Sequence, residues 1–420
     1  MEREIKRENY LQKLIDAKGD GLIKVVTGLR KVGKSYLLGT IFRRYLLACN
    51  IPQENIIEMN LSFDEFAQYK DKKVLRAYLD AHTQGKGPYY LILDEIQEMA
   101  GFAPFLLSLQ TKSNIDIYVT GSNSHLLSKD IETEFRGSGE GIMLYPASFK
   151  EFSEVSDLPE DKALQRYLDY GGMPLAVFMS KAVQREAYLS TLFETTYLKD
   201  IEERNGIENK VVFEKLADIL SSDIGSLTNA ANLENAFRSA HLPIANDTIA
   251  KYIGYLTDSF LFEECKRYDI KGKQYISTPV KYYCGDLGLR NARLHYRDQE
   301  YQYLIENAVY LELKRRGYSV DVGVVPVQEK DDNGKHIVKK YEIDFIANRG
   351  NERSYIQVAL SLEGEGKYDQ EARPFRKTKD AFRKIMVVRD QHGSPRYNEE
   401  GCLIVSLADF LLDESILASF

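Results

Sequence analysis

A glycine-rich loop near the N-terminus combines residue types and a spacing that suit phosphate chemistry. Residues 28–35 read GLRKVGKS, the full pattern G-x-x-x-x-G-K-S, between apolar runs at 22–27 and 36–47. Such glycines let backbone N–H groups close around phosphates, and the start of the next helix adds partial positive charge. We expect Lys34 to neutralise phosphate charge and the Ser35 hydroxyl to bind Mg²⁺. The loop predicts an ATP site with contacts from Gly28, Arg30, Gly33, Lys34 and Ser35.

Two carboxylates follow a second apolar run. Asp94 and Glu95 come directly after residues 89–93, a pattern typical of a strand buried on both faces of a parallel sheet. At that strand end Asp94 can hold Mg²⁺ through its waters, and Glu95 can orient and deprotonate an attacking water. Two exposed acids in a turn are the alternative for this dipeptide alone. The glycine-rich loop at 28–35 favours the interpretation that Asp94 and Glu95 act together in ATP hydrolysis.

Small polar residues follow a third strand pattern at 115–120. Ser122 and Asn123 could reach the γ-phosphate there, and being uncharged they could hold a water in line without disturbing the charge at the metal. A plain polar turn fits the same residues. A sensing role and a structural turn both remain open.

The composition is globular and lacks a strong bulk charge. The 420 residues carry a net charge of -7, so any nucleic-acid contact must come from a local patch. The charged N-terminus does not read as a signal core, and no run approaches the roughly 18 apolar residues of a membrane span. The scattered cysteines and histidines lack metal-ligand spacing. We expect a cytoplasmic protein with no membrane partner and no transition metal.

The order of elements predicts an α/β chain whose first 295 residues form three parts. Strands alternate with helices over residues 1–150, as in the parallel sheet of a P-loop ATPase core. Residues 151–208 read as a helical lid. Residues 209–295 read as three helices and a hairpin, the order of a winged-helix module. DNA binding through the hairpin and a packing or protein-contact role both remain open. The basic hairpin residues are Lys266, Arg267, Lys271 and Lys273.

Alternation returns in residues 296–420, which predicts a C-terminal α/β domain. Glu306 on a helix, Glu342 and Asp344 on one face of a strand, and Gln357 on the next strand could converge. Such a cluster can hold Mg²⁺ for phosphodiester cleavage.

One position argues against cleavage. Metal-dependent nucleases of this layout place a lysine two residues after the acid or amide of the second strand, and here that residue is Ala359. A methyl group supplies no charge to the transition state. We expect an inactive nuclease-like domain, unless a cation such as Lys367 or Arg373 takes that place.

Several longer segments match one family. They are the loop at 28–35, LDEIQ at 93–97, TGSNS at 120–124, YPASFKEF at 145–152, YGGMP at 170–174, TTYLKDI at 195–201 and EIDFI at 342–346. Over essentially its full length the chain resembles prokaryotic AAA+-type, STAND-like P-loop ATPases. These carry a C-terminal domain of unknown function with a restriction-endonuclease-like core.

The resemblance implies a signalling-type ATPase and further site residues. A G-x-P turn that packs its proline on adenine carries over to Gly172 and Pro174. Where the family often has R-G-R-G, this chain has RGSG at 136–139. Arg136 is therefore the candidate for a charge on the γ-phosphate, in cis or across a homo-oligomer interface, although Ser138 puts that role in doubt. A solvated loop arginine is the alternative.

Three functions compete at this point. The leading one is an ATP-hydrolysing regulatory switch that couples nucleotide state to the winged-helix and C-terminal domains, with an unknown protein partner. The second is an ATP-controlled DNA-cleaving effector, which Ala359 disfavours. The third is a non-hydrolysing nucleotide-dependent interaction module, which Glu95 disfavours.

Overall fold

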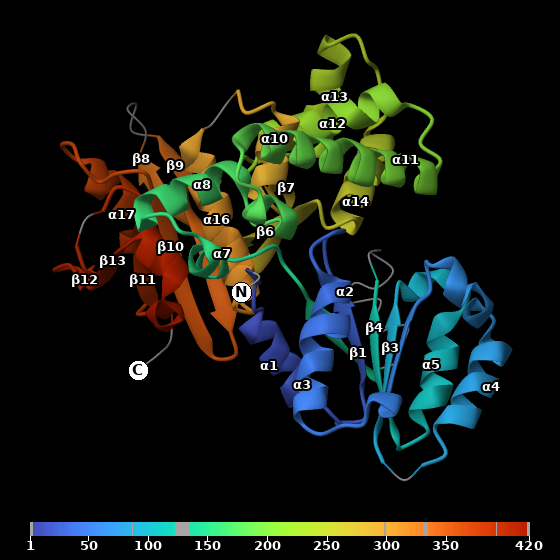
Figure 1. Ribbon diagram of the computed structural model, residues 1–420. Helices are drawn as coiled ribbons and strands as arrows, with labels where there is room; N and C mark the ends of the chain where they lie inside the picture. Colours follow the sequence, from blue (N-terminus) through green and yellow to red (C-terminus); the bar gives the residue numbers. More distant parts are fainter. Residues whose placement is uncertain are drawn as a thin grey trace. The chain divides into compact units, whose positions relative to one another are not determined.

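The chain folds into two compact units (Figure 1). The computed structural model describes residues 3–85, 87–121, 135, 137–297, 300–330, 335–391 and 393–417. Unit 1 contains the residues up to Pro146 together with Asp258–Phe260, and unit 2 contains Ala147–Thr257 and the residues from Leu261 onward. Across the described ranges, no helix has the length and apolar character that a membrane crossing requires.

Unit 1 is built on a five-stranded sheet in which all neighbouring strands are parallel. The strands are β1 (Ile23–Thr27), β2 (Ile56–Asn60), β3 (Tyr89–Asp94), β4 (Ile115–Thr120) and β5 (Gly139–Met143). These positions confirm the predicted strands to within a few residues. The order β2-β3-β4-β1-β5 places β4 between β1 and β3. The carboxyl ends of these three strands therefore lie together at one edge.

Helices cover both faces of this sheet, with α4 and α5 on one side and α1 and α3 on the other (Figure 1). The helix after the glycine-rich loop is continuous, because α2 (Lys34–Tyr36), a π-helical segment η1 (Leu37–Phe42) and α3 (Arg43–Ala48) follow without a break. The other helical segments are α1 (Glu8–Asp16), η2 (Gln53–Asn55), η3 (Asp64–Lys70), α4 (Lys72–His82), η4 (Ile96–Glu98) and α5 (Phe102–Gln110). Buried residues of the strands, α4 and α5 form one apolar core.

Unit 2 begins with helices, and residues 147–226 contain no strand, which agrees with the helical pattern expected over 151–208. The first helix, α7, starts at a capping box in which Ser148 and Glu151 satisfy each other's backbone N–H groups. The helices before the second sheet are α7 (Phe149–Val155), α8 (Glu160–Tyr170), α9 (Pro174–Phe178), α10 (Ala182–Thr191), η6 (Leu192–Leu198), α11 (Lys199–Asn205), α12 (Lys210–Ser222), α13 (Ala230–Ser239) and α14 (Asn246–Asp258).

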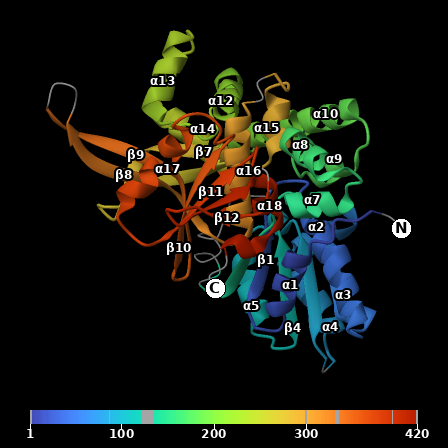
Figure 2. The same ribbon diagram turned by 90° about the vertical axis from the view of Figure 1, so that its left-hand side faces the viewer.

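The second sheet has eight strands in the order β12-β13-β11-β10-β9-β8-β6-β7. They are β6 (Phe262–Asp269), β7 (Gln274–Cys284), β8 (Ser319–Lys330), β9 (His336–Arg349), β10 (Glu352–Ala359), β11 (Arg383–Val388), β12 (Arg396–Tyr397) and β13 (Cys402–Ser406). The remaining helices are α15 (Leu287–Arg293), α16 (Tyr301–Arg315), α17 (Lys367–Thr378), α18 (Leu407–Leu412) and η7 (Glu414–Leu417). Figure 2 shows β8 and β9 as a long hairpin.

The β6–β7 hairpin differs from the separate wing that the sequence suggested. β6 pairs in parallel with β8, with Arg267 opposite Val322 and Asp269 opposite Val324. The hairpin is therefore part of the C-terminal sheet. This pairing joins segments about 55 residues apart, so no local pattern announces it.

Candidate functional site

The glycine-rich loop of unit 1 adopts a backbone that its glycines make possible. Gly28 has φ 139° and Gly33 has φ 102°, both in the region that residues with a Cβ avoid. A Cβ on Gly28 would lie 2.2 Å from the carbonyl oxygen of Leu144. Leu144 in turn donates its N–H to Thr27 O at 2.8 Å. The chain that follows β5 thus packs directly against the start of the loop.

Lys34 lies inside the loop. Its side chain is buried, and its ammonium group donates to the carbonyl oxygens of Gly28 and Leu29, both at 3.0 Å. Burial lowers the pKa of Lys34 to about 8, and the opposing charges of Glu95 and Asp94 limit that fall. A phosphate brought to this ammonium would stabilise the charged form that burial disfavours.

Asp94 is fixed by side chains from the two neighbouring strand ends. Asn60, the last residue of β2, donates its amide to Asp94 Oδ2 at 2.6 Å. Thr120, the last residue of β4, donates its hydroxyl to Asp94 Oδ1. The same hydroxyl oxygen accepts the N–H of Glu95 at 3.1 Å. The strand order therefore orients both carboxylate residues through one threonine.

Glu95 has φ 54°, a left-handed conformation that non-glycine residues rarely adopt. Its carboxylate accepts a hydrogen bond from the side-chain amide of Gln97. Glu95 is only partly buried, whereas Asp94 is 5% exposed. A partly exposed carboxylate held beside a buried one suits two different tasks, contact with water and support of a metal.

These side chains have the donor set of a magnesium nucleotide site. Lys34 offers a buried cation, Ser35 an exposed hydroxyl at the start of the helix, and Asp94 a buried carboxylate. Magnesium in such sites keeps several waters and uses one or two protein oxygens together with the phosphates. Among the described residues no group of three or more His, Cys, Asp or Glu side chains could hold a metal by itself.

The geometry described so far does not test the other predicted site residues. Ser122, Asn123 and Arg136 lie outside the described residues. Arg30 is half-buried in the loop. Their roles stay predictions.

Gly172 and Pro174 belong to unit 2, where other residues of that unit hold their turn. Gly172 donates its N–H to Asp286 Oδ2 at 2.7 Å and accepts the N–H of Ala147 at 2.8 Å. A Cβ on Gly172 would lie 2.2 Å from Ala147 O. Burial raises the pKa of Asp286 to about 6 against the opposing N–H of Gly172. This packing explains the glycine, and the predicted contact of Pro174 with adenine stays a prediction.

Sequence reasoning missed three residues around the loop. Thr120 and Asn60 are polar residues that end parallel strands, and this position was a signal that could have found them. Arg7, just before α1, is 4% exposed and donates to Val32 O at 3.1 Å. An arginine in a charged N-terminal run gives no such signal.

In unit 2 the acidic cluster contains a cation that the sequence analysis did not consider. Lys281 of β7 is buried and contacts Glu306 at 3.0 Å and Glu342 at 2.9 Å. Burial disfavours its charge, but Glu306 and Glu342 together raise the pKa of Lys281 above its ordinary value. Tyr283 also donates to Glu306 at 2.6 Å. The assumption that Ala359 leaves the cluster without a cation was therefore wrong.

The remaining members of the cluster lie on β9 and β10. Asp344 Oδ2 accepts the N–H of Val358 at 2.8 Å, and the N–H of Asp344 reaches Gln357 Oε1 at 3.4 Å. Burial, followed by the charge of Glu306, raises the pKa of Asp344 well above its ordinary value. The four predicted residues do converge, with Lys281 among their carboxylates.

Comparison with known proteins shows which family the chain belongs to. A family model described as an AAA domain matches residues 20–153, and one described as a domain of unknown function (DUF8612) matches residues 161–300. An uncharacterized protein of Haemophilus influenzae is 34% identical over 414 residues, which cover 97% of this chain and 98% of that protein. An uncharacterized protein of Methanocaldococcus jannaschii is 26% identical over 403 residues, or 92% and 85% of the two chains.

Solved structures are more distant. The ORC1 protein of Aeropyrum pernix in complex with DNA has 11% identity and a TM-score of 0.30, covering 69% of this chain and 92% of its own. AMPPCP-bound DnaA of Aquifex aeolicus has 12% identity and a TM-score of 0.32, covering 60% and 87%. Likenesses this weak carry no argument about function. The 34% identity to the Haemophilus influenzae protein over 97% of this chain shows that the chain belongs to that protein's family, and its N-terminal part is an AAA domain.

Proposed function

We propose that this protein is a magnesium-dependent ATPase that acts as a regulatory switch, with its nucleotide state controlling unit 2. The observation that carries the proposal is the joint arrangement of Lys34, Asp94 and Glu95 at the carboxyl ends of β1 and β3. The match of residues 20–153 to an AAA domain supports it.

In this proposal each residue has a separate task. Lys34 binds the β- and γ-phosphates, while Ser35 and Asp94 hold Mg²⁺, which neutralises phosphate charge. Glu95 orients a water and accepts its proton as the water attacks the γ-phosphorus. The bond to the bridging oxygen breaks, and ADP leaves. Thr120 is a positioning residue, because it fixes both Asp94 and the backbone of Glu95.

The connection between the units supports a switch rather than simple turnover. Leu144 is held against the loop, because its N–H bonds Thr27 and its carbonyl lies where a Gly28 side chain would be. Ala147 is held by unit 2 through Gly172. Only residues 145 and 146 separate these two anchored residues. We therefore expect a shift of the loop on phosphate binding to be passed on to Ala147 and unit 2, because so short a segment can absorb little movement.

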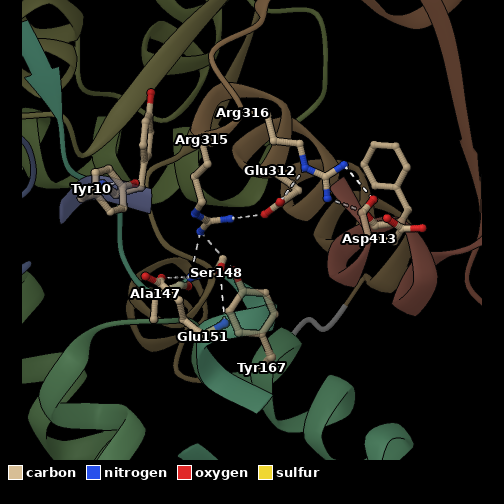
Figure 3. Close-up of polar contacts among 11 residues, drawn as sticks. Tyr10, Ala147, Ser148, Glu151, Tyr167, Glu312, Arg315, Arg316 and Asp413 are labelled. Atoms are coloured by element: carbon tan, nitrogen blue, oxygen red, sulfur yellow. Dashed lines mark hydrogen bonds and ion pairs between the residues drawn. The ribbon is translucent and has the colours of Figure 1, made fainter. Parts of the chain in front are cut away.

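The unit 2 end of this segment is fixed by α16. Arg315 donates to Ala147 O at 3.5 Å and to the hydroxyl of Tyr167 at 3.1 Å, and pairs with Glu312 at 3.2 Å (Figure 3). Arg316 pairs with the same Glu312 at 2.8 Å and also donates to the carbonyl oxygen of Asp413 at 3.4 Å. Movement at Ala147 is thereby coupled to α7, α8, α16 and the segment that follows α18 at Asp413.

The finer domain assignments belong to the same proposal. We assign α12, α13, α14 and the β6–β7 hairpin as a winged-helix-like module whose hairpin also extends the C-terminal sheet, and strands β8 to β13 of that sheet as an inactive endonuclease-like core. Within the cluster, Lys281 neutralises carboxylates that would otherwise bind a metal. A homo-oligomer, with Arg136 acting on the γ-phosphate in cis or across subunits, and an unidentified protein partner complete the proposal.

The test combines turnover with a readout of unit 2. Phosphate release is measured for the parent, Lys34→Ala and the exposed control Lys73→Ala, and amide hydrogen exchange is followed with ATP and with ADP. We expect Lys34→Ala to abolish turnover and Lys73→Ala to keep it. In the parent and control, exchange at 144–155 should differ between the two nucleotides. Hydrolysis without any nucleotide-dependent exchange in unit 2 would refute the switch.

A further inference from the structure

One groove on unit 2 is unrelated to the ATP site and to the acidic cluster. It encloses about 740 Å³ between three turns, those joining β6 to β7, β9 to β10 and α17 to β11. This volume falls within the range of about 300 to 1,000 Å³ that ligand sites occupy. Its lining mixes basic and aromatic side chains.

The centre of the groove is a stacked platform. The guanidinium of Arg353 lies 5.6 Å from the ring centre of Tyr268 and 5.2 Å from that of Phe382. Its Nε donates to Asn348 Oδ1 at 2.7 Å, which fixes the plane. Phe382 is 41% exposed, so part of its ring faces solvent. The platform therefore offers flat π surface at the protein exterior.

Unpaired positive charge surrounds this platform. Lys271, Lys273 and Lys379 line the groove and are exposed. Throughout the described part of the chain, neither these lysines nor Arg353 forms an ion pair; the ammonium group of Lys271 donates to the carbonyl oxygen of Pro326 at 2.8 Å.

The lining also contains two acids, Asp380 and Glu352. Asp380 accepts the hydroxyl of Tyr355 at 2.8 Å, and Glu352 lies 3.6 Å from Arg349. Because Lys271, Lys273, Lys379 and Arg353 outnumber these two acids, the balance of charge in the groove is positive, although the whole chain carries -7. A local basic patch on an acidic protein is the pattern expected of a specific polyanion site.

We propose that this groove binds single-stranded nucleic acid without sequence preference. The exposed Phe382 ring and the stacked Arg353 guanidinium accept the faces of unpaired bases, and the three lysines contact the phosphodiester backbone. A duplex hides its base faces and could use only the charges. The inference goes beyond the proposed switch and does not depend on ATP hydrolysis.

The test uses the full-length protein and a fluorescent oligo(dT) of about 12 nucleotides in anisotropy titrations over a range of salt concentrations. Three phosphate contacts, one for each lysine, predict a slope of log K against log salt of about -2, since each contributes about -0.7 on a single strand. Lys273→Gln with Lys379→Gln should reduce this slope by about 1.4 and affinity at least tenfold. Phe382→Ala should weaken binding about five- to 150-fold with no change in slope.

Matched variants decide the outcome. Lys162→Gln with Lys181→Gln changes the charge equally on exposed lysines outside the groove and should bind like the parent, as should Lys34→Ala. Loss of binding in Lys34→Ala would place the oligonucleotide in the ATP loop and overturn the proposal. Equal weakening by the two double variants, or equal affinity for a duplex of the same length, would also overturn it.

Discussion

The pH dependence of nucleotide binding follows from the burial of Lys34. Burial lowers its pKa from the ordinary 10.5 to about 8. The free protein is then about 90% charged at this lysine at pH 7 and about 10% charged at pH 9. If bound phosphate restores the ordinary pKa, the affinity for MgATP should be about tenfold lower at pH 9 than at pH 7. Binding at pH 8.5 should take up about 0.7 proton.

Isothermal titration in buffers of different ionisation enthalpy measures both quantities. Lys34→Arg is the matched control, because a guanidinium stays charged throughout and its pH profile should be flat. The nucleotide-free protein should show the opposite trend in stability. Its folded state loses the Lys34 proton before the unfolded chain does, so this group makes the free energy of unfolding rise between about pH 8 and 10.5. A pH-independent affinity without proton uptake would refute the reasoning.

Three further predictions concern other residues. Lys281→Met leaves buried carboxylates uncompensated and should lower the free energy of unfolding by about 3–5 kcal/mol in urea denaturation. Adding Glu306→Gln should recover part of this loss. No recovery would show that the Lys281–Glu306 ion pair does not cause it. Arg136→Ala should lower ATP turnover while nucleotide affinity stays within a few fold, because the charge acts in the transition state. Turnover equal to that of the parent would show that Arg136 is only a loop cation. The full-length protein with Mg²⁺ or Mn²⁺ and ATP should leave supercoiled and single-stranded DNA intact, and cleavage that Asp344→Ala removes would establish a nuclease.

Local patterns were sufficient to predict the strands of unit 1. The apolar runs that end at Thr27, Asp94 and Thr120 each become a buried parallel strand. An apolar run followed by a polar turn can take few other forms in an alternating chain. The full glycine pattern likewise predicted where the loop begins, and the observed φ of Gly28 and Gly33 follows from it.

Long-range pairing was not predictable in the same way. β6 joins β8 across the whole of α15 and α16, and β13 (Cys402–Ser406) was not expected at all. Lys281 stood in an apolar stretch that gave no sign of Glu306 opposite it. Thr120 became meaningful only once the strand order placed β4 beside β3. In each case the missing information was which segments meet.

The most direct test of the central claim is phosphate release by Glu95→Gln beside its nucleotide affinity. The substitution keeps the size of the side chain and removes the base. The account predicts that MgATP binds within a few fold of the parent, while turnover falls by about two orders of magnitude or more. Turnover equal to that of the parent at saturating ATP would contradict the assignment of Glu95 and with it the proposed hydrolytic switch.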